Sequence, residues 1–374
     1  MKPFEEPIYI TRPLLPDLRE VNRELEEIWN SQWLTNNGPK HKQLEGEIRR
    51  VLKVPYVSLF NNGTTALIIA INSLRLSGEV ITTPFTFPAT PHALSWNGIT
   101  PVFCDINSET MNIDADKVKQ MITPRTTAIL AVHVFGTPCD VGKIQYVANR
   151  YGLRVIYDAA HAFGVTIDDR GIGTFGDTSA FSFHATKLFH TAEGGVLTFS
   201  DPNLKEQTDL IKNFGIKSED EVIMPGINGK MNEIQAALGL VNLRYIEAER
   251  EQRRKIVDTY KKCLRDVEGI TISELPSNST SSYQYFVIRV DNVRFGISRD
   301  EVYMRLKGYN VFSRKYFYPL CSDYPYYRNL PSADPANLPV ARKVVKEVLC
   351  LPLYGKLPLS AAEKICDMIR DFRK

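Results

Sequence analysis

The 374-residue sequence has little of what marks several large classes of protein. It contains six cysteines, none in a Cys-x-x-Cys spacing or clustered with histidine, so the sequence predicts neither a disulfide framework nor a zinc site. No run of about 18 apolar residues occurs, and the first residues carry acids without an apolar segment. We therefore expect a cytoplasmic protein with reduced thiols, no membrane span and no signal peptide.

An excess of charge of one sign is also absent. Forty-six Lys and Arg residues face 43 Asp and Glu residues, and a net charge of +3 over this length does not indicate a nucleic-acid partner. The composition, 43% hydrophobic and 24% charged, is typical of a folded globular protein. At about 150 residues per domain, the length predicts two or three domains, or one large domain with an appendage.

Short apolar runs alternate with amphipathic stretches from residue 54 to residue 160. This alternation predicts crossover units, and therefore an α/β fold with a mostly parallel sheet covered by helices. Polar sequences follow the expected strands, namely FNNGTT, TPFTFPAT, HVFGTP and YDAAH. Because ligands bind at the carboxyl ends of parallel strands, we expect the functional site at these segments.

The second half of the chain changes character. Apolar runs at 178–184 and 195–200 predict a hairpin or a neighbouring strand pair, and one long helix is expected from about Met231 to Cys263. The remainder mixes short strands, an aromatic stretch and helices, which is typical of a smaller α+β domain. We therefore divide the chain into a large domain, residues 1–240, and a small C-terminal domain, residues 241–374.

Residues 171–176, Gly-Ile-Gly-Thr-Phe-Gly, match the GxGxxG pattern of dinucleotide-binding proteins letter for letter. The motif works only between a strand and a helix whose N-terminus binds the pyrophosphate. Here an Asp-Asp-Arg turn precedes the glycines and a strand-like run follows them. We interpret the segment as a surface turn and keep a dehydrogenase as the less favoured alternative.

Three polar segments are candidates for chemistry. Lys187 follows a strand in SFHATK, where loss of solvation would make it a Schiff-base nucleophile, although most loop lysines are only solvated charges. Residues 62–65, Asn-Gly-Thr-Thr, open a helix and favour a phosphate, or simply form an N-cap. Asp158 ends LRVIYD, where it could keep a pyridinium nitrogen protonated or serve a turn.

With TPFTFPAT, VHVFGTPCD and GINGKMNEIQAALG, these motifs occur in the order and spacing of the nucleotide-sugar aminotransferases. The sequence resembles that family, the DegT/StrS branch of fold type I pyridoxal phosphate enzymes, over nearly its whole length. The resemblance implies a large cofactor-binding domain and a smaller C-terminal domain. It also implies that Lys187 binds the cofactor covalently and transfers protons, that Asp158 pairs with the pyridine nitrogen, and that His161 lies near the cofactor's hydroxyl.

Further cofactor contacts follow from the same resemblance. Phe87 would stack on the ring, with ordinary core packing as its alternative, and the phosphate would be held by Gly63, Thr64, Thr65 and Ser182. Asn228 matches the asparagine that reaches the phosphate of the neighbouring subunit, which implies a homodimer with shared active sites; its alternative is a Gly-rich turn.

The sequence departs from the family after Asn228, since many relatives have Tyr-Arg where this chain has Gly229-Lys230. The contacts that the tyrosine and the arginine make in those relatives are therefore in doubt here. His133, His184 and His190 are interpreted as structural, because Lys187 already supplies proton transfer. No metal is expected.

By the same resemblance, the expected reaction transfers an amino group from L-glutamate, through pyridoxamine phosphate, to a nucleotide-linked ketosugar. A few relatives that remove oxygen from sugars carry histidine in place of the lysine, so the retained Lys187 favours transamination. The stretches 318–321 and 324–327 resemble those of enzymes that make dTDP-4-amino-4,6-dideoxyglucose, which implies amination at C4 of dTDP-4-keto-6-deoxyglucose. Arg314 and Lys315 would bind the diphosphate or are solvated surface charges.

Two other functions stay open at this point. One is amination at C3 of a dTDP-3-keto-6-deoxyhexose, and the other is a non-catalytic regulator that binds pyridoxal phosphate. The resemblance also suggests a pathway to deoxyamino sugars of O antigen or another surface polysaccharide.

Overall fold

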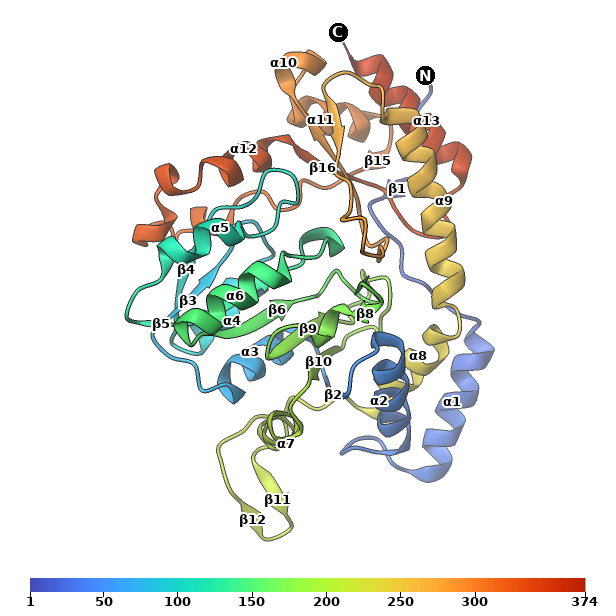
Figure 1. Ribbon diagram of the computed structural model, residues 1–374. Helices are drawn as coiled ribbons and strands as arrows, with labels where there is room; N and C mark the ends of the chain where they lie inside the picture. Colours follow the sequence, from blue (N-terminus) through green and yellow to red (C-terminus); the bar gives the residue numbers. More distant parts are fainter. Residues whose placement is uncertain (374) are drawn as a thin grey trace.

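The computed structural model describes residues 1–373 and is built around a seven-stranded sheet with the order β2-β10-β9-β6-β5-β3-β4 (Figure 1). The strands are β2 (Tyr56–Phe60), β3 (Glu79–Thr82), β4 (Thr100–Phe103), β5 (Thr126–Val132), β6 (Arg154–Asp158), β9 (Thr178–Ser182) and β10 (Gly195–Phe199). Only β10 runs antiparallel to its neighbours; the other pairs are parallel. The expected α/β fold and the expected pairing of the runs at 178–184 and 195–200 are confirmed.

Helices cover both faces of this sheet (Figure 1). On one face lie α3 (Gly63–Ser73), α4 (Ala89–Trp96) and α7 (Pro202–Ile211), and on the other lie α5 (Ala115–Val118) and α6 (Val141–Tyr151). Successive residues of a strand pack on opposite faces of the sheet. In β3, Val80 packs with the first group of helices and Ile81 packs with the second. Because side chains alternate along a strand, one apolar strand can fill two cores, which explains the continuous apolar runs in the sequence.

The prediction of a single helix from about Met231 to Cys263 is wrong. The structure has two helices, α8 (Glu233–Leu243) and α9 (Ile246–Leu264). At their junction the N–H groups of Arg244 and Tyr245 bond to carbonyls three residues back, at 3.1 and 3.0 Å, instead of four. This tight turn ends the first helix without a glycine or a proline, so the sequence carried no signal for it. It lets α8 pack on α2 (Pro39–Leu52) and α9 on α13 (Leu359–Phe372).

The C-terminal part has its own core. A three-stranded sheet of β13 (Ile270–Ile272), β14 (Phe286–Val290) and β16 (Val348–Leu351) packs with α9, α11 (Arg299–Gly308) and α13. The N-terminal β1 (Ile8–Tyr9) pairs in parallel with β15 (Val311–Phe312) of this part. The division of the chain at residue 240 stays a prediction.

The remaining elements are short or peripheral. They are α1 (Leu18–Ser31), β7 (Thr166–Ile167), β8 (Arg170–Gly171), β11 (Ile216–Ser218), β12 (Glu221–Val222), α10 (Asn292–Phe295) and α12 (Pro339–Glu347). The GxGxxG segment, residues 171–176, supplies the last residue of β8 and a single turn of 3-10 helix before β9, so its interpretation as a turn is confirmed. Its expected place on the surface is wrong, because Gly171, Ile172 and Gly173 are buried and Ile172 packs in the core. None of the helices formed by residues 1–373 is long and apolar enough to cross a membrane.

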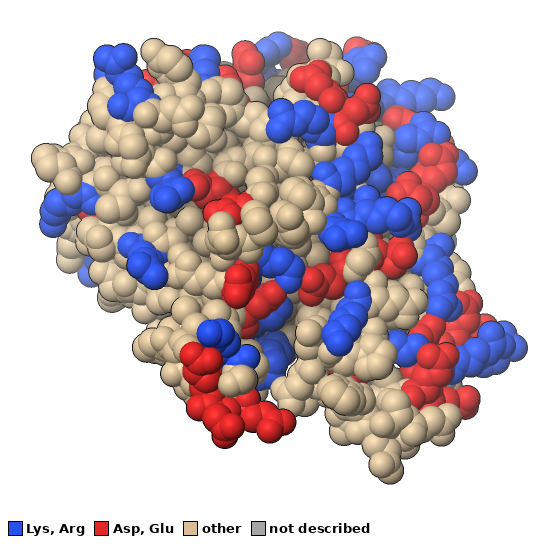
Figure 2. All heavy atoms as spheres, turned by 60° about the horizontal axis from the view of Figure 1, so that its bottom comes forward, with Lys and Arg blue, Asp and Glu red and all other residues tan. Residues whose placement is uncertain are grey.

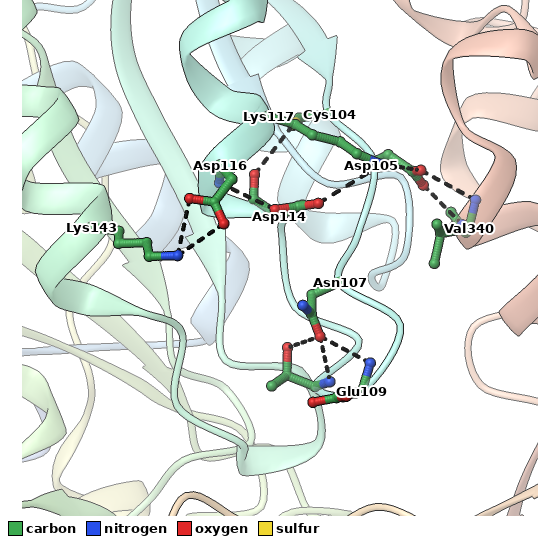
Figure 3. A network of polar contacts seen from close by, with 11 residues as sticks. Cys104, Asp105, Asn107, Glu109, Asp114, Asp116, Lys117, Lys143 and Val340 are labelled. Carbon is green, nitrogen blue, oxygen red and sulfur yellow. Dashed lines mark hydrogen bonds and ion pairs between the residues drawn. The ribbon is translucent and has the colours of Figure 1, made fainter.

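Asp105, just after β4, links the large sheet to the C-terminal part (Figure 3). Its buried carboxylate accepts hydrogen bonds from the backbone N–H groups of Val340 (3.2 Å) and Ala341 (2.9 Å), in the first turn of α12. Lys117 Nζ donates a third hydrogen bond to the same carboxylate, at 2.9 Å. A buried carboxylate is tolerated only when such partners replace its water.

Replacing Asp105 by alanine is therefore expected to lower the free energy of unfolding by about 3 kcal/mol, because it leaves two helix N–H groups unpaired and removes the nearer of the two carboxylates that contact Lys117. Urea denaturation measures the change. The matched control is Asp116→Ala, which breaks an exposed pair with Lys143 and should change stability by less than about 1 kcal/mol. Equal losses in the two variants would mean that the Asp105 hydrogen bonds do not stabilise the fold.

Candidate active site

One cavity contains nearly all the residues predicted from the sequence. It has a volume of about 630 Å³ and lies at the carboxyl ends of β6 and β9, beside the N-terminus of α3. The predicted residues that line it are Gly63, Thr64, Thr65, Phe87, Asp158, His161, Ser182 and Lys187. Their individual roles stay predictions, but they lie at one place on the protein.

Lys187 is fixed in the loop after β9 by backbone hydrogen bonds on both sides. Its N–H donates to the carbonyl of His184 (2.9 Å), and the next N–H, of Leu188, donates to Gln284 Oε1 (2.6 Å). Burial lowers the pKa of the Lys187 ammonium to about 8, and the Asp158 carboxylate acts in the opposite direction. At pH 7 about a tenth of this amine is thus uncharged, far more than for an ordinary lysine, and the uncharged form is the nucleophile.

Asp158 ends β6 and is buried in the floor of the cavity. Its carboxylate accepts hydrogen bonds from Thr90 Oγ1 (2.7 Å) and from the N–H of Ala160 (3.1 Å). Thr90 Oγ1 also lies 2.8 Å from the Thr86 hydroxyl, so a second hydrogen bond holds the Thr90 side chain in place. Burial raises the pKa of Asp158, whereas these hydrogen bonds and the Lys187 charge lower it. The arrangement fixes the carboxylate in one orientation.

The His161 ring is held between aromatic side chains. It stacks on Phe317 with ring centroids 5.7 Å apart and meets the edge of Tyr285 at 5.1 Å. Burial lowers the pKa of His161 well below its ordinary value, so the ring is neutral. Its buried Nδ1 has no hydrogen-bond partner among residues 1–373. Such an atom is suited to a polar group of a bound ligand.

Phe87 projects into the open part of the cavity. Its side chain is 56% exposed, whereas Phe85, two residues earlier, is completely buried. Core packing is thereby excluded as the reason for an aromatic residue at position 87.

The N-terminus of α3 provides free hydrogen-bond donors. The Asn62 side chain accepts from the N–H of Thr65 (2.8 Å), while the N–H groups of Gly63 and Thr64 have no acceptor within the described chain. A Cβ atom at Gly63 would lie 3.0 Å from Ser182 Cβ, so a larger residue here would require Ser182 to shift. Free N–H groups and the helix dipole make this helix end suited to a phosphate, and it is a candidate phosphate cradle.

Asn228 does not line this cavity. It is exposed, its carbonyl accepts a long hydrogen bond from Asn61 Nδ2 (3.4 Å), and its backbone forms a bridge with Asn213. Its exposure fits the prediction that it serves a neighbouring subunit, which no contact within one chain tests. Lys230, where many relatives have arginine, donates instead to Asn213 Oδ1 (2.8 Å).

The sequence predicted structural roles for His133, His184 and His190, and the three differ in their surroundings. His133 is buried against Tyr157, with ring centroids 4.6 Å apart, and accepts from the N–H of Cys139, so it is structural. His190 bonds to the carbonyl of Leu14. His184, however, lines the cavity, with its Nε2 3.6 Å from Glu193 Oε1.

Among the lining residues that were not predicted from the sequence, three are aromatic: Tyr285, Tyr316 and Phe317. All come from the C-terminal part, far along the chain from the other residues. The available signal was the aromatic stretch that contains Tyr316 and Phe317, which ends in the Tyr-Pro sequence already compared with relatives. Tyr285 had no such signal.

The donor set fits pyridoxal phosphate. A nucleophilic amine and a buried carboxylate lie in one cavity with a neutral imidazole that lacks a partner, and a helix N-terminus offers its N–H groups to a phosphate. Across residues 1–373, no three or more His, Cys, Asp or Glu side chains are grouped so that they could hold a metal ion.

Comparisons with known proteins agree with this chemistry. Residues 17–370 match the DegT/DnrJ/EryC1/StrS aminotransferase family. The dTDP-4-amino-4,6-dideoxy-D-glucose transaminase of Escherichia coli is 48% identical over 368 residues, which cover 98% of each chain. The structure of DesI in the presence of its TDP-sugar product is similar with a TM-score of 0.94 and 34% identity, covering 99% of this chain and 94% of DesI.

A second solved structure bears on the cofactor. The putative sugar aminotransferase Spr1654 of Streptococcus pneumoniae, known in a PLP-form and a PMP-form, is similar with a TM-score of 0.90 and 26% identity over 98% of each chain. The chain is therefore a pyridoxal-phosphate-dependent sugar transaminase and belongs to the DegT/DnrJ/EryC1/StrS aminotransferase family.

Proposed function

We propose that this enzyme transfers the amino group of L-glutamate to C4 of dTDP-4-keto-6-deoxyglucose. One observation carries the proposal: Lys187, Asp158 and the phosphate cradle line one cavity in a chain 48% identical to a transaminase named for dTDP-4-amino-4,6-dideoxy-D-glucose. When bound, pyridoxal phosphate supplies an aldehyde that takes up the amino group and a ring that accepts electrons from the substrate.

The protein's own groups supply binding and proton transfer. Lys187 would hold the cofactor and then move a proton, and a pKa of about 8 lets its amine act as base or acid near neutral pH. Asp158 would keep the ring nitrogen protonated, in the orientation that Thr90 fixes. Tyr285, Tyr316 and Phe317 would exclude water from the reacting atoms.

Arg314 is the better of the two basic residues proposed for the sugar diphosphate. Lys315 Nζ is already engaged by Asp300, at 3.0 Å. Arg314 is exposed, and its guanidinium has no acidic partner among residues 1–373. Burial raises the pKa of the cavity residue Tyr316, and the nearby Arg314 charge acts against that rise. A free guanidinium beside the cavity suits a diphosphate.

The decisive experiment incubates the holoenzyme with L-glutamate and a panel of nucleotide-linked 4-keto and 3-keto sugars, and locates the new amine by NMR. We expect an amine at C4 of the dTDP sugar and formation of 2-oxoglutarate. An amine at C3 would establish the C3 alternative instead. Cofactor binding without product from any sugar would favour the non-catalytic regulator.

The pKa of Lys187 predicts how cofactor capture depends on pH. Because only the uncharged amine reacts, the rate at which the apoprotein captures pyridoxal phosphate covalently should rise about tenfold per pH unit at low pH and level off above the pKa of about 8. Borohydride trapping at timed intervals measures the rate. Lys187→Ala is the control and should trap no cofactor. A rate that keeps rising to pH 10 would show that burial does not lower this pKa.

A homodimer with shared sites is part of the proposal, as are a cytoplasmic location and a role in surface polysaccharide or O-antigen synthesis. Mixing inactive Lys187→Ala and Asn228→Ala proteins should restore about a quarter of wild-type activity, because half of the dimers would be hybrids with one intact site each. Native mass spectrometry verifies subunit exchange. Exchange without recovered activity would show that Asn228 does not act across the dimer.

A further inference from the structure

A second cavity lies away from the active site, along the outer edge of the sheet. Its volume is about 400 Å³, and it shares no lining residue with the active-site cavity. It is bordered by α2, by the edge strand β2 and by α7. Figure 2 turns the lower side of the molecule forward and shows basic side chains set into a recess of that face.

Positive charge exceeds negative charge in this cavity. Its charged lining residues are Lys42, Glu45, Arg49, Lys205, Asp209, Lys212 and Lys230, which leaves an excess of three positive charges. Both carboxylates are already used: Asp209 contacts Lys205 (2.5 Å) and Lys212 (2.6 Å), and Glu45 contacts Lys205 (3.1 Å).

The other three cations lack a carboxylate partner within the described chain. They are Lys42, Arg49 and Lys230. Burial lowers the pKa of Lys230, and the Lys212 charge lowers it further. His41, also in the lining, has a buried Nδ1 without a hydrogen-bond partner, and burial lowers its pKa to about 3. Cationic groups that repel one another in a cleft are typical of a binding site.

The helix α2 leaves room for a ligand between two of these cations. Lys42, Gly46 and Arg49 are four and three residues apart, so they share one helix face. A Cβ atom built on Gly46 would meet no atom within 4 Å. Glycine inside a helix costs about 1 kcal/mol relative to alanine, and no close packing requires it at this exposed position.

We propose that this cavity binds a diphosphate, either inorganic or as part of a nucleotide. Its excess of three positive charges matches the charge of an ionised diphosphate, and its volume lies in the range of small-ligand sites. Arg49 offers paired donors to phosphate oxygens, and Lys42 and Lys230 offer point charges. The site is separate from the proposed amination and does not depend on it.

Isothermal titration of the Arg314→Gln holoenzyme with sodium pyrophosphate at constant ionic strength tests the proposal, since the bound cofactor then fills the active-site phosphate cradle and the diphosphate contact proposed at Arg314 is removed. We expect saturable binding that the double variant K42Q/R49Q weakens by about tenfold or more. Gly46→Leu should block binding by filling the cavity, without removing a charge. The matched control is Arg50→Gln, which removes the same charge from a residue paired with Glu47 (2.7 Å) and outside the cavity.

The outcomes are distinct. No saturable pyrophosphate or dTDP binding up to about 10 mM, or equal weakening by Arg50→Gln and K42Q/R49Q, would overturn the proposal. Binding of pyrophosphate that only the cavity variants weaken supports an inorganic diphosphate. If dTDP alone gives such variant-sensitive binding, the ligand is a nucleotide. Failure of the proposed amination would leave this result unchanged. Binding to the second cavity requires no turnover, and Lys187→Ala protein, which should be inactive, keeps all the residues that line it.

Discussion

Replacing Lys187 by alanine should abolish transamination while leaving the protein able to bind pyridoxal phosphate. The amine is the only lysine nitrogen among the residues that line the active-site cavity, so its loss removes both the nucleophile and the group that moves the proton. We expect kcat to fall by about 10⁴-fold or more. The remaining contacts, above all the cradle at Gly63 and Ser182, should still hold the phosphate.

Two measurements separate these effects. Turnover of glutamate with the dTDP ketosugar reports the chemistry, and equilibrium dialysis with pyridoxal phosphate reports binding. The matched control is Lys119→Ala, which removes an exposed lysine outside the cavity and should leave both unchanged. Substantial turnover by the Lys187 variant would remove the basis of the proposed mechanism.

Asp158→Asn should lower kcat by about 10³-fold with little effect on folding, since general acid–base and electrostatic contributions of single groups fall in this range. The amide has the same shape but no negative charge, so it cannot keep a pyridine nitrogen protonated. Burial raises the pKa of Asp158, which means that the folded apoprotein disfavours the charged carboxylate. Losing this charge should therefore not destabilise the apoprotein at neutral pH.

Thermal unfolding of the apoprotein distinguishes lost chemistry from lost structure. We expect an unchanged or slightly higher midpoint for Asp158→Asn, together with the loss of turnover. Asp116→Asn, at an exposed position, is the control for the same chemical change. A rate close to that of the unmodified enzyme would mean that the carboxylate does not tune the cofactor.

The strand ends and their polar residues could be predicted from the sequence alone. Apolar runs of strand length alternate with amphipathic helices from residue 54 to residue 160, and this local pattern requires a mostly parallel sheet. Asp158 ends β6 and Lys187 lies in the loop that follows β9, so their place at one edge of the sheet needed no knowledge of long-range packing. The GxGxxG segment was set aside on the same local grounds.

Contacts between distant segments could not be predicted in this way. Tyr285 and Phe317 enter the cavity because the C-terminal part packs against the sheet, and Thr90 reaches Asp158 across 68 positions of sequence. The break between α8 and α9 has no glycine or proline to mark it.

The charges around the cavity beside β2 could not be predicted from the sequence either. Lys42 and Arg49 on α2 line the same cavity as Lys230 only because both segments border the same edge of the sheet. The sequence by itself determined the sheet, its strand ends and the cofactor chemistry, since these depend on neighbours along the chain. Which side chains enclose each cavity, and which charges stay unpaired, was decided by the tertiary structure, because burial and pairing depend on segments far apart in the sequence.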